Sequence, residues 1–261
     1  MRDISYLIKY YENYNEQSRL ESKHGKIEYL TTMKYIHDYL QPGMRILEVG
    51  AGTGRYALTL AREGYQVNAI ELVQHNIDIL NSYIQPNDNI QVDQGDALDL
   101  SRYNDETFNL TLVLGPMYHL YNDEDKIQCL KEAIRVTKKY GKIMVSYCLN
   151  EATVITYAFV GNNIKECLAK NMLTEDFHCK STAKDIFELV RIEDINRINS
   201  YFNIERDKLI ATDGATRYIR QVIDDMDEET YNIYLKYHLS ICERQDLIGA
   251  SHHCLDILTK K

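Results

Sequence analysis

The sequence predicts an α/β fold in which a doubly wound, largely parallel sheet is covered by helices on both faces. Three observations lead to this prediction. An apolar run at 44–49 is followed at once by three closely spaced glycines and a helical pattern at 56–63, the usual opening of a βαβ unit. Short apolar segments then alternate with helical ones as far as residue 147. The run at 107–114 is the most apolar, as is typical of the centre of a sheet buried on both faces.

Composition and charge narrow the class of protein. The 261 residues, 44% of them hydrophobic and 26% charged, suit one large globular domain with additions or two small domains. The net charge of −9 argues against a broad phosphate-binding surface, so a nucleic-acid partner is not expected. No run is long enough to span a membrane and no signal peptide is recognised, which predicts a cytoplasmic protein without a membrane partner. The six cysteines are dispersed without a Cys-x-x-Cys pair, which favours reduced thiols.

Residues 1–43 are predicted to form a helical cap before the sheet begins. An aromatic stripe with helical spacing opens the chain, and such stripes are more often packing faces than ligand sites. The stripe consists of Tyr6, Tyr10, Tyr11 and Tyr14. A second amphipathic helix follows His24 and stops at Pro42-Gly43. A segment in this position can lie over the mouth of a nucleotide site, so Tyr14 and His24 are candidate substrate contacts, although an exposed histidine is the simpler interpretation of His24.

The glycine-rich turn indicates what kind of ligand the sheet holds. Its glycines leave the backbone free to turn tightly and to approach a ligand, and the N–H groups at the start of the next helix favour polar or anionic ligand atoms. A dinucleotide fingerprint would place a third glycine at position 55, where this chain has Arg55. Glu48, two residues before Gly50, suits a cationic ligand better than a pyrophosphate. The strand at 65–71 ends in Glu71, 21 residues after Gly50, where a carboxylate can accept both ribose hydroxyls.

The pattern Glu48-x-Gly50-x-Gly52-x-Gly54, followed by Glu71 and by Asp96-Ala97 after the third strand, resembles the class I S-adenosylmethionine-dependent methyltransferases. This resemblance covers 44 to about 148 and implies a Rossmann-like seven-stranded sheet with the last strand antiparallel. It implies S-adenosylmethionine as cofactor, with its methionyl end at the glycine loop near Glu48 and its adenine amino group at Asp96. The expected cofactor contacts are Glu48, Gly50, Ala51, Gly52, Gly54, Glu71, Leu72, Asp96, Ala97, Leu114 and, for the methionyl carboxylate, Arg19.

The loop after the most apolar strand is the expected site of methyl transfer, because ligands bind beyond the carboxyl ends of such strands. Its Gly-Pro-Met-Tyr-His-Leu sequence resembles a bacterial, small-molecule-type subgroup of unassigned substrate. Methyl transfer requires an acceptor held in line and water excluded. For a hydroxyl or ammonium acceptor, His119 is the candidate base and Tyr118 would orient the acceptor. A thiolate acceptor needs no base, and a structural hydrogen-bonding role for His119 is an equal alternative.

The rest of the chain completes the predicted domains. Asp123 caps a helix at 124–139, and a fifth strand follows at 142–147. A helical lid at 151–200, with segments near 151–160, 162–171 and 182–199, is inserted in a cofactor-binding core formed by 44–150 and 201–261. Strands at 201–212 and 251–258, with a helix at 227–244 between them, close the sheet. His252 and His253 are not expected to bind a metal, because neighbours on a strand point to opposite faces.

The function predicted from the sequence is methyl transfer from S-adenosylmethionine to a small-molecule acceptor by in-line displacement. Several alternatives stay open at this stage. A tRNA, rRNA or protein methyltransferase, a non-catalytic cofactor-binding protein and an NAD-type dehydrogenase can all use a related fold. The sequence does not indicate an oligomeric state.

Overall fold

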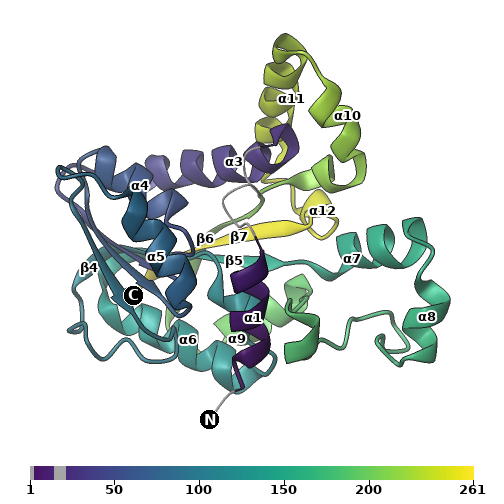
Figure 1. Ribbon diagram of the computed structural model, residues 1–261, viewed down its shortest axis with the longest axis horizontal. Coiled ribbons are helices and arrows are strands. Elements are labelled where there is room, and N and C mark those ends of the chain that lie inside the picture. The colour runs from purple at the N-terminus through teal and green to yellow at the C-terminus, as the bar shows by residue number, and fades with distance from the viewer. Residues whose placement is uncertain (1–2, 15–21) are drawn as a thin grey trace.

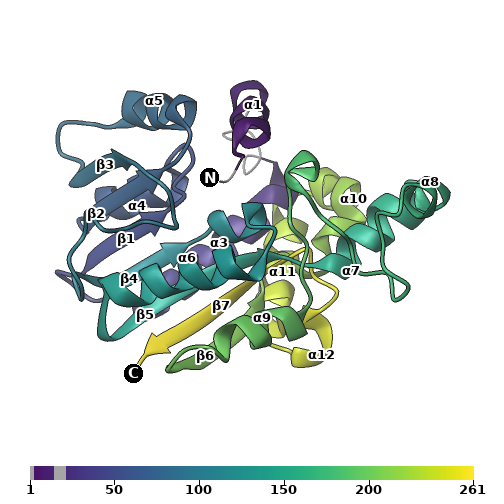
Figure 2. The ribbon, with the colours of Figure 1, turned by 90° about the horizontal axis from the view of Figure 1, so that it is seen from below.

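A computed structural model describes residues 3–14 and 22–261 and contains a seven-stranded sheet in the order β3-β2-β1-β4-β5-β7-β6 (Figures 1 and 2). The strands are β1 Arg45–Val49, β2 Gln66–Glu71, β3 Ile90–Gln94, β4 Phe108–Val113, β5 Thr137–Cys148, β6 Ile204–Ala211 and β7 His253–Lys260. Strands β1 to β5 pair in parallel, whereas β7 is antiparallel to both β5 and β6. The predicted α/β, Rossmann-like architecture with an antiparallel last strand is therefore confirmed.

Two apolar cores flank the sheet, one on each face. Alternate residues of the strands contribute to opposite cores, as the pleat of a strand requires: Ile46 belongs to one and Leu47 to the other. Helices α3 Lys23–Tyr39 and α4 Arg55–Arg62 pack in the first core, and α6 Asp123–Val136 and α9 Ile192–Asn199 pack in the second. The other helices are α1 Ser5–Asn13, α5 Gln74–Tyr83, α7 Asn150–Thr153, α8 Ile164–Ala169, α10 Arg220–Asp225, α11 Glu228–Ile241 and α12 Gln245–Ile248. Among the described residues, no helix is both long and apolar enough to cross a bilayer.

Residues between β5 and β6 leave the sheet and return to it at one point, which we call the neck and which consists of Leu149, Asn150 and Val190. Leu149 and Val190 pair as an isolated bridge, and the N–H of Asn150 donates to the carbonyl of Val190 at 3.0 Å. Beyond this neck lie α7, a π-helical turn at Val154–Val160, α8 and a 3₁₀ turn at Ala183–Asp185. A small apolar cluster of their own side chains holds them together. We call residues 150–189 the lid.

Several predicted helix boundaries are wrong, because contacts with remote segments of the chain decide where those helices begin and end. The third predicted lid helix, 182–199, is α-helical only from Ile192, because the chain between the 3₁₀ turn and that residue runs back to pair with Leu149. The helix predicted at 124–139 ends at Val136, since Thr137 pairs with Phe108 of β4 and starts β5. Asn122, not Asp123, caps that helix, accepting from the N–H of Asp125 at 2.8 Å.

The segment after β6 contains helical structure before the helix predicted at 227–244. A 3₁₀ helix at Gly214–Ile219 leads directly into α10, and Ile223 of α10 packs on Ile27 and Tyr231. The helix predicted at 227–244 is α11, which Asp227 caps by accepting from the N–H of Thr230 at 2.7 Å. This excursion brings residues 213–225 against the start of α3, as the upper right of Figure 1 shows.

Candidate active site

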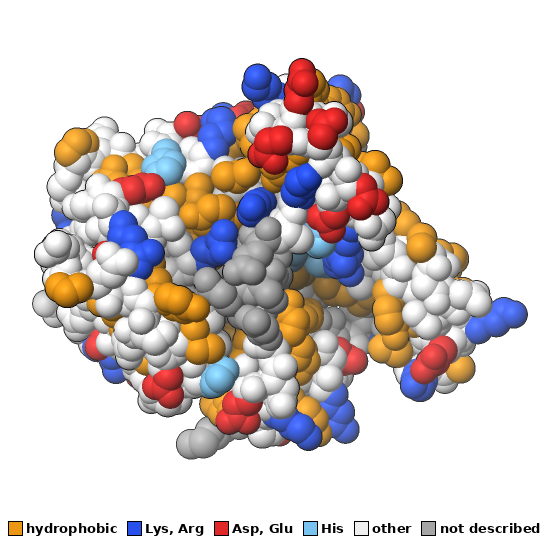
Figure 3. Space-filling view, turned by 45° about the horizontal axis from the view of Figure 1, so that its top comes forward, with side chains coloured by type: hydrophobic (Ala, Val, Ile, Leu, Met, Phe, Trp, Pro, Cys, Tyr) orange, Lys and Arg blue, Asp and Glu red, His pale blue; other side chains and the backbone are white. Residues whose placement is uncertain are grey.

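A cavity of about 910 Å³ lies beyond the carboxyl ends of β1, β2 and β4. Its walls come from the glycine loop, α1, the start of α3, the lid and the segment after β6. Figure 3 shows the hollow between the body of the molecule and the lid. The predicted site residues that line it are Glu48, Gly50, Ala51, Gly52, Glu71, Leu72, Asp96, Ala97, Leu114, Tyr14, His24, Tyr118 and His119. Gly54 is not among the lining residues, and Arg19 lies outside the described residues.

The first N–H groups of the glycine loop are used within the protein. The N–H groups of Gly50 and Ala51 both donate to the carbonyl of Ile70, at 2.8 and 3.1 Å. Gly50 has φ +72°, and a Cβ there would meet the ring of Pro116 at 2.7 Å. Gly54 has φ +83°, and a Cβ there would meet Leu80 at 2.5 Å. These two glycines are therefore required by the protein's own packing, in addition to any close approach of a ligand.

Glu71 connects the glycine loop to the end of β2. Its carboxylate accepts from the N–H groups of Gly52 at 2.9 Å and Val73 at 3.0 Å, and from the side-chain amide of Asn76 at 3.3 Å. Burial raises the pKa of Glu71, and the hydrogen bonds from Val73, Gly52 and Asn76 oppose that rise. The backbone N–H of Leu72 also contributes, so a ribose hydroxyl from the cavity would share a carboxylate oxygen with these donors.

Glu48 lies at the end of β1 and is 2% exposed. Burial raises the pKa of its carboxyl to about 8, with a hydrogen bond from the N–H of Ala57 opposing the rise and the charge of Glu71 adding to it. Its Oε2 atom is buried without a hydrogen-bond partner among the described residues. A buried carboxyl that lines a cavity and has one oxygen without a hydrogen bond from the described residues fits a ligand that brings a positive charge. The loop, Glu71 and Glu48 thus suit a cofactor with a ribose and a cationic end.

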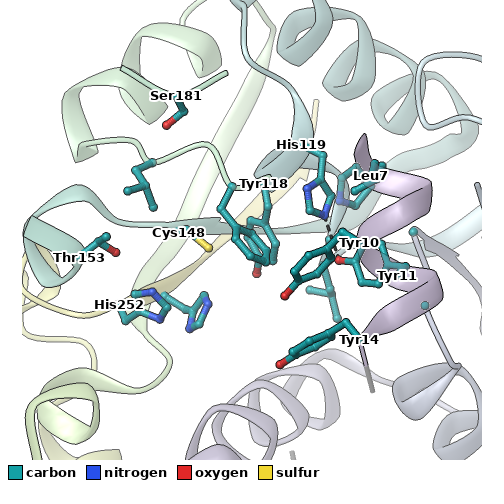
Figure 4. A pocket seen from close by; sticks show the side chains of 18 of the residues that line it. Leu7, Tyr10, Tyr11, Tyr14, Tyr118, His119, Cys148, Thr153, Ser181 and His252 are labelled. Atoms are coloured by element: carbon teal, nitrogen blue, oxygen red, sulfur yellow. Dashed lines mark hydrogen bonds between the residues drawn. The ribbon is translucent and has the colours of Figure 1, made fainter. Parts of the chain in front are cut away.

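The far end of the cavity is aromatic. No residue of α1 is buried, and Tyr10, Tyr11 and Tyr14 face the cavity (Figure 4). Tyr10 stacks on Tyr14 with ring centroids 5.0 Å apart and meets Phe187 of the lid edge-on at 5.6 Å. The tyrosine stripe is therefore more than an ordinary packing face, because three of its four rings line the cavity.

His119 is held between α1 and the lid in a single arrangement. Its Nδ1 lies 2.8 Å from the carbonyl oxygen of Ile186, which can only accept, so Nδ1 carries the proton. Its Nε2 then accepts from the hydroxyl of Tyr11 at 3.0 Å (dashed line in Figure 4). Ile186 adopts φ +67°, a costly angle for a β-branched residue, and its carbonyl also accepts from Tyr121 at 2.6 Å. In the neutral imidazole, these contacts therefore place the proton on Nδ1 and leave Nε2 as the acceptor.

His24 and Tyr118 also line the cavity but differ in their surroundings. His24, near the start of α3, is tied to α10 because its Nδ1 lies 2.7 Å from the carboxylate of Asp224. Its Nε2 lies 3.3 Å from the hydroxyl of Ser22. Tyr118 is 7% exposed, and its ring lies 5.9 Å from that of His253. Both residues stay predictions as substrate contacts.

A cluster of charged residues in the same cavity went unrecognised in the sequence. Glu28 of α3, Asp213 after β6, and His252 and His253 at the start of β7 come together there. The prediction that His252 and His253 point to opposite faces is wrong, because β7 begins only at His253. The centroids of the two rings lie 4.1 Å apart. Burial acts against a charged His253, but Glu28 and Asp213 raise its pKa well above the usual value. The spacing of these residues along the sequence does not predict the cluster. The adjacent pair of histidines is its one feature that the sequence displays.

Comparison with known proteins agrees with this geometry. A family model described as a methyltransferase domain matches residues 46–141. A ubiquinone biosynthesis O-methyltransferase of Rickettsia bellii is 25% identical over 198 residues, which span 74% of this chain and 75% of that protein. A putative methyltransferase of Bacillus subtilis is 23% identical over 111 residues, covering 42% of this chain and 45% of the relative.

Solved structures share the fold over almost the whole chain. A methyltransferase of Thermotoga maritima, described as a possible histamine N-methyltransferase, superposes with a TM-score of 0.60 at 19% identity, covering 99% of this chain and 100% of that one. Magnesium protoporphyrin IX methyltransferase of Synechocystis PCC 6803, with bound S-adenosylhomocysteine, gives a TM-score of 0.59 at 9% identity over 99% and 100% of the two chains. These structures therefore share the overall fold of this chain.

Proposed function

We propose that this protein, which is a class I S-adenosylmethionine-dependent methyltransferase, methylates a hydroxyl group on a small aromatic molecule. The observation that carries the proposal is the pairing of Tyr11 with the basic Nε2 of His119 in an aromatic-walled cavity. Membership of the family identifies the methyl donor. The acceptor is inferred from the residues that line the cavity.

The size and enclosure of the cavity favour a small acceptor. Pockets for single drug-sized ligands span roughly 300–1,000 Å³. A cavity of about 910 Å³ is at the top of that range, so it has room for the cofactor and for a second small molecule. Helix α1 and the lid both cover the aromatic end, and His119 and Tyr121 are hydrogen-bonded to the lid carbonyl of Ile186. A polymer would require this cover to open.

The aromatic rings indicate the character of the acceptor. The ring of Tyr10 lies within 6 Å of the rings of Tyr14 and Phe187, one stacked and one edge-on, and such groups favour a flat aromatic partner. The chain's relatives include O-methyltransferases of ubiquinone biosynthesis, which supports an oxygen acceptor without identifying it.

The bound cofactor supplies an electrophilic methyl group, and the protein's residues must then hold the acceptor in line and remove its proton. The hydroxyl of Tyr11 lies 3.0 Å from His119 Nε2, and a phenol hydroxyl is able both to donate and to accept a hydrogen bond. An acceptor hydroxyl that donates to Tyr11 would pass its proton through Tyr11 to Nε2. The carbonyl of Ile186 keeps the opposite nitrogen protonated and stabilises the imidazolium that forms.

The experiment is a measurement of S-adenosylhomocysteine release with a panel of small phenols, catechols, aryl amines and thiols. We expect release with phenolic acceptors, and we expect His119→Gln to reduce kcat by about 10²- to 10⁴-fold with unchanged affinity for S-adenosylhomocysteine. The matched control is His37→Gln, because His37 also pairs with an acceptor oxygen, that of Glu63 at 2.8 Å, but is not among the cavity residues.

Two results would contradict this proposal. Turnover of a phenol by His119→Gln at close to the wild-type rate would remove the base from the mechanism. Turnover of aryl amines but not of phenols would show that the methyl group is transferred to nitrogen and not to oxygen. That second candidate has its own support, because Glu28 and Asp213 place two carboxyl groups on the cavity wall that can attract a cation.

A further inference from the structure

We propose that Asp213, His252 and His253 form a binding site for a divalent transition-metal ion in the wall of the cavity. This inference does not depend on the acceptor proposed above, because it concerns the affinity of the protein for the ion alone. In Figure 4, His252 lies on the wall opposite α1, so the proposed site is separate from the Tyr11–His119 pair.

The three side chains already converge on one point. Each offers a ligand atom, and these atoms all lie within 4.8 Å of one another. Asp213 Oδ2 lies 2.9 Å from His253 Nδ1 and 3.8 Å from His252 Nδ1. Ligand bonds of about 2.0–2.2 Å to zinc-like ions place neighbouring donors roughly 3–4 Å apart, so only small rotations of the rings are needed to admit an ion.

Asp213 is oriented as a metal-binding carboxylate should be. Its Oδ1 atom is occupied by the hydroxyl of Ser251 at 2.6 Å and by the N–H groups of His252 and His253, both at 3.0 Å. These bonds fix the carboxylate plane and direct Oδ2 towards the two imidazoles. Such outer hydrogen bonds orient the ligands of known metal sites and cost affinity when they are removed.

A second carboxylate increases the negative charge at this point. Glu28 Oε2 lies 3.5 Å from His253 Nδ1, and both side chains are 11% exposed. Two carboxyl groups and two imidazoles within one partly enclosed pocket favour a dication, because a single proton neutralises only part of the charge. Glu28 can complete the donor set or balance its charge.

The donor set selects the class of ion. Imidazole nitrogen with carboxylate oxygen is typical of Zn²⁺, Fe²⁺, Mn²⁺ or Co²⁺ sites, whereas Mg²⁺ and Ca²⁺ prefer oxygen alone. Because all three ligands line the cavity, an ion bound there would remain accessible to a further oxygen donor from it. A cavity-bound molecule with a carboxylate or hydroxyl group would then gain a fixed anchor, as open metal sites provide.

The test uses the full chain after treatment with a chelator and its removal. We expect Co²⁺ to bind with one-to-one stoichiometry and to produce visible absorption bands, and Zn²⁺ to displace it. His252→Ala should weaken Zn²⁺ binding at least about tenfold, and Asp213→Asn by more. The matched control is His37→Ala, which removes a histidine paired with Glu63 elsewhere on the protein and should leave Zn²⁺ affinity unchanged.

Affinity for S-adenosylhomocysteine serves as the check on folding in every variant. If Asp213→Asn fails this check, His252→Ala still decides, because His252 precedes β7 and carries none of its strand pairing. The proposal would be overturned by unmeasurable Co²⁺ binding to the wild type, by equal losses in His252→Ala and His37→Ala, or by full Zn²⁺ binding in His252→Ala.

Discussion

The two ends of the cavity are built in different ways. The proposed cofactor end is made by residues at the carboxyl ends of three strands: Glu48 near the end of β1, Glu71 at the end of β2 and Asp96 just after β3. Its key bond, from the N–H of Gly52 to Glu71, joins residues only 19 positions apart. The acceptor end is assembled from remote segments. Tyr11 meets His119 across 108 positions, and His24 meets Asp224 across 200.

The two ends therefore differ in which properties of the protein a substitution can alter. The cofactor end is tied into the strands of the sheet, so a substitution there affects folding and cofactor affinity together. The acceptor end rests on α1, the lid and the segment after β6, whose mutual contacts are mostly side chain to side chain or side chain to carbonyl. Acceptor preference can therefore change while the cofactor site is preserved.

The largest expected effect is at Glu71. Replacing Glu71 with Ala leaves the N–H groups of Gly52 and Val73 without their acceptor and removes the expected ribose contact. Affinity for S-adenosylhomocysteine should fall about 100-fold or more, roughly 3 kcal/mol, as measured by titration calorimetry. Glu63→Ala, which removes the partner of His37, is the control and should bind normally. Equal affinity in the two variants would show that Glu71 does not define the cofactor end.

A pH dependence of stability is expected from Glu48. Its folded pKa of about 8 lies above the ordinary carboxyl value, so the folded protein keeps a proton that the unfolded chain releases. This contribution to stability is present below about pH 4.5 and is lost as pH rises towards 8. Glu48→Gln should therefore become more stable relative to wild type across pH 5–8, by roughly 2–4 kcal/mol in total.

Urea unfolding of both proteins at several pH values, without cofactor, measures this difference. Because many other carboxyl groups titrate in the same range, only the difference between variant and wild type is informative. Parallel stability curves would mean that Glu48 is ionised in the folded protein at neutral pH.

Tyr11 tests whether the acceptor end acts as a unit. Tyr11→Phe keeps the ring but removes the hydroxyl that donates to His119 Nε2. We expect kcat with a phenolic acceptor to fall about tenfold, near the contribution of one hydrogen bond, with unchanged cofactor affinity. Tyr10→Phe on the same helix, which preserves the stacking on Tyr14, is the control. A faster Tyr11→Phe enzyme would indicate that Tyr11 blocks His119 and does not relay its proton.

The smallest expected effect is at Ile186, where the lid meets His119. Glycine at this position relieves the strain of φ +67° but loses the side chain's packing and adds chain entropy, so stability should stay within about 1 kcal/mol of wild type. Leu189→Gly, at a buried position without a positive φ, should cost several kcal/mol. Thermal unfolding compares the two. A large loss in Ile186→Gly would mean that the side chain, and not only the carbonyl, holds the lid.

The sequence alone was enough to predict the sheet and to propose which residues hold the cofactor. Glu48, the glycines and Glu71 could be recognised because parallel strands place their carboxyl ends at one edge, so a spacing along the chain becomes a position in space. Even there, the packing of Gly50 on Pro116 and of Gly54 on Leu80 was not predictable, because those partners come from other segments.

Only the tertiary structure decided the acceptor end. The tyrosine stripe of α1 has the same periodicity whether it faces a core or a cavity, and nothing local distinguishes the two. The tautomer of His119 depends on a lid carbonyl 67 positions away. The cluster of Asp213 with His252 and His253 depends on where β7 begins. Short-range patterns fix local structure, whereas contacts between remote segments arise only when the whole chain has packed, and the acceptor end consists of such contacts.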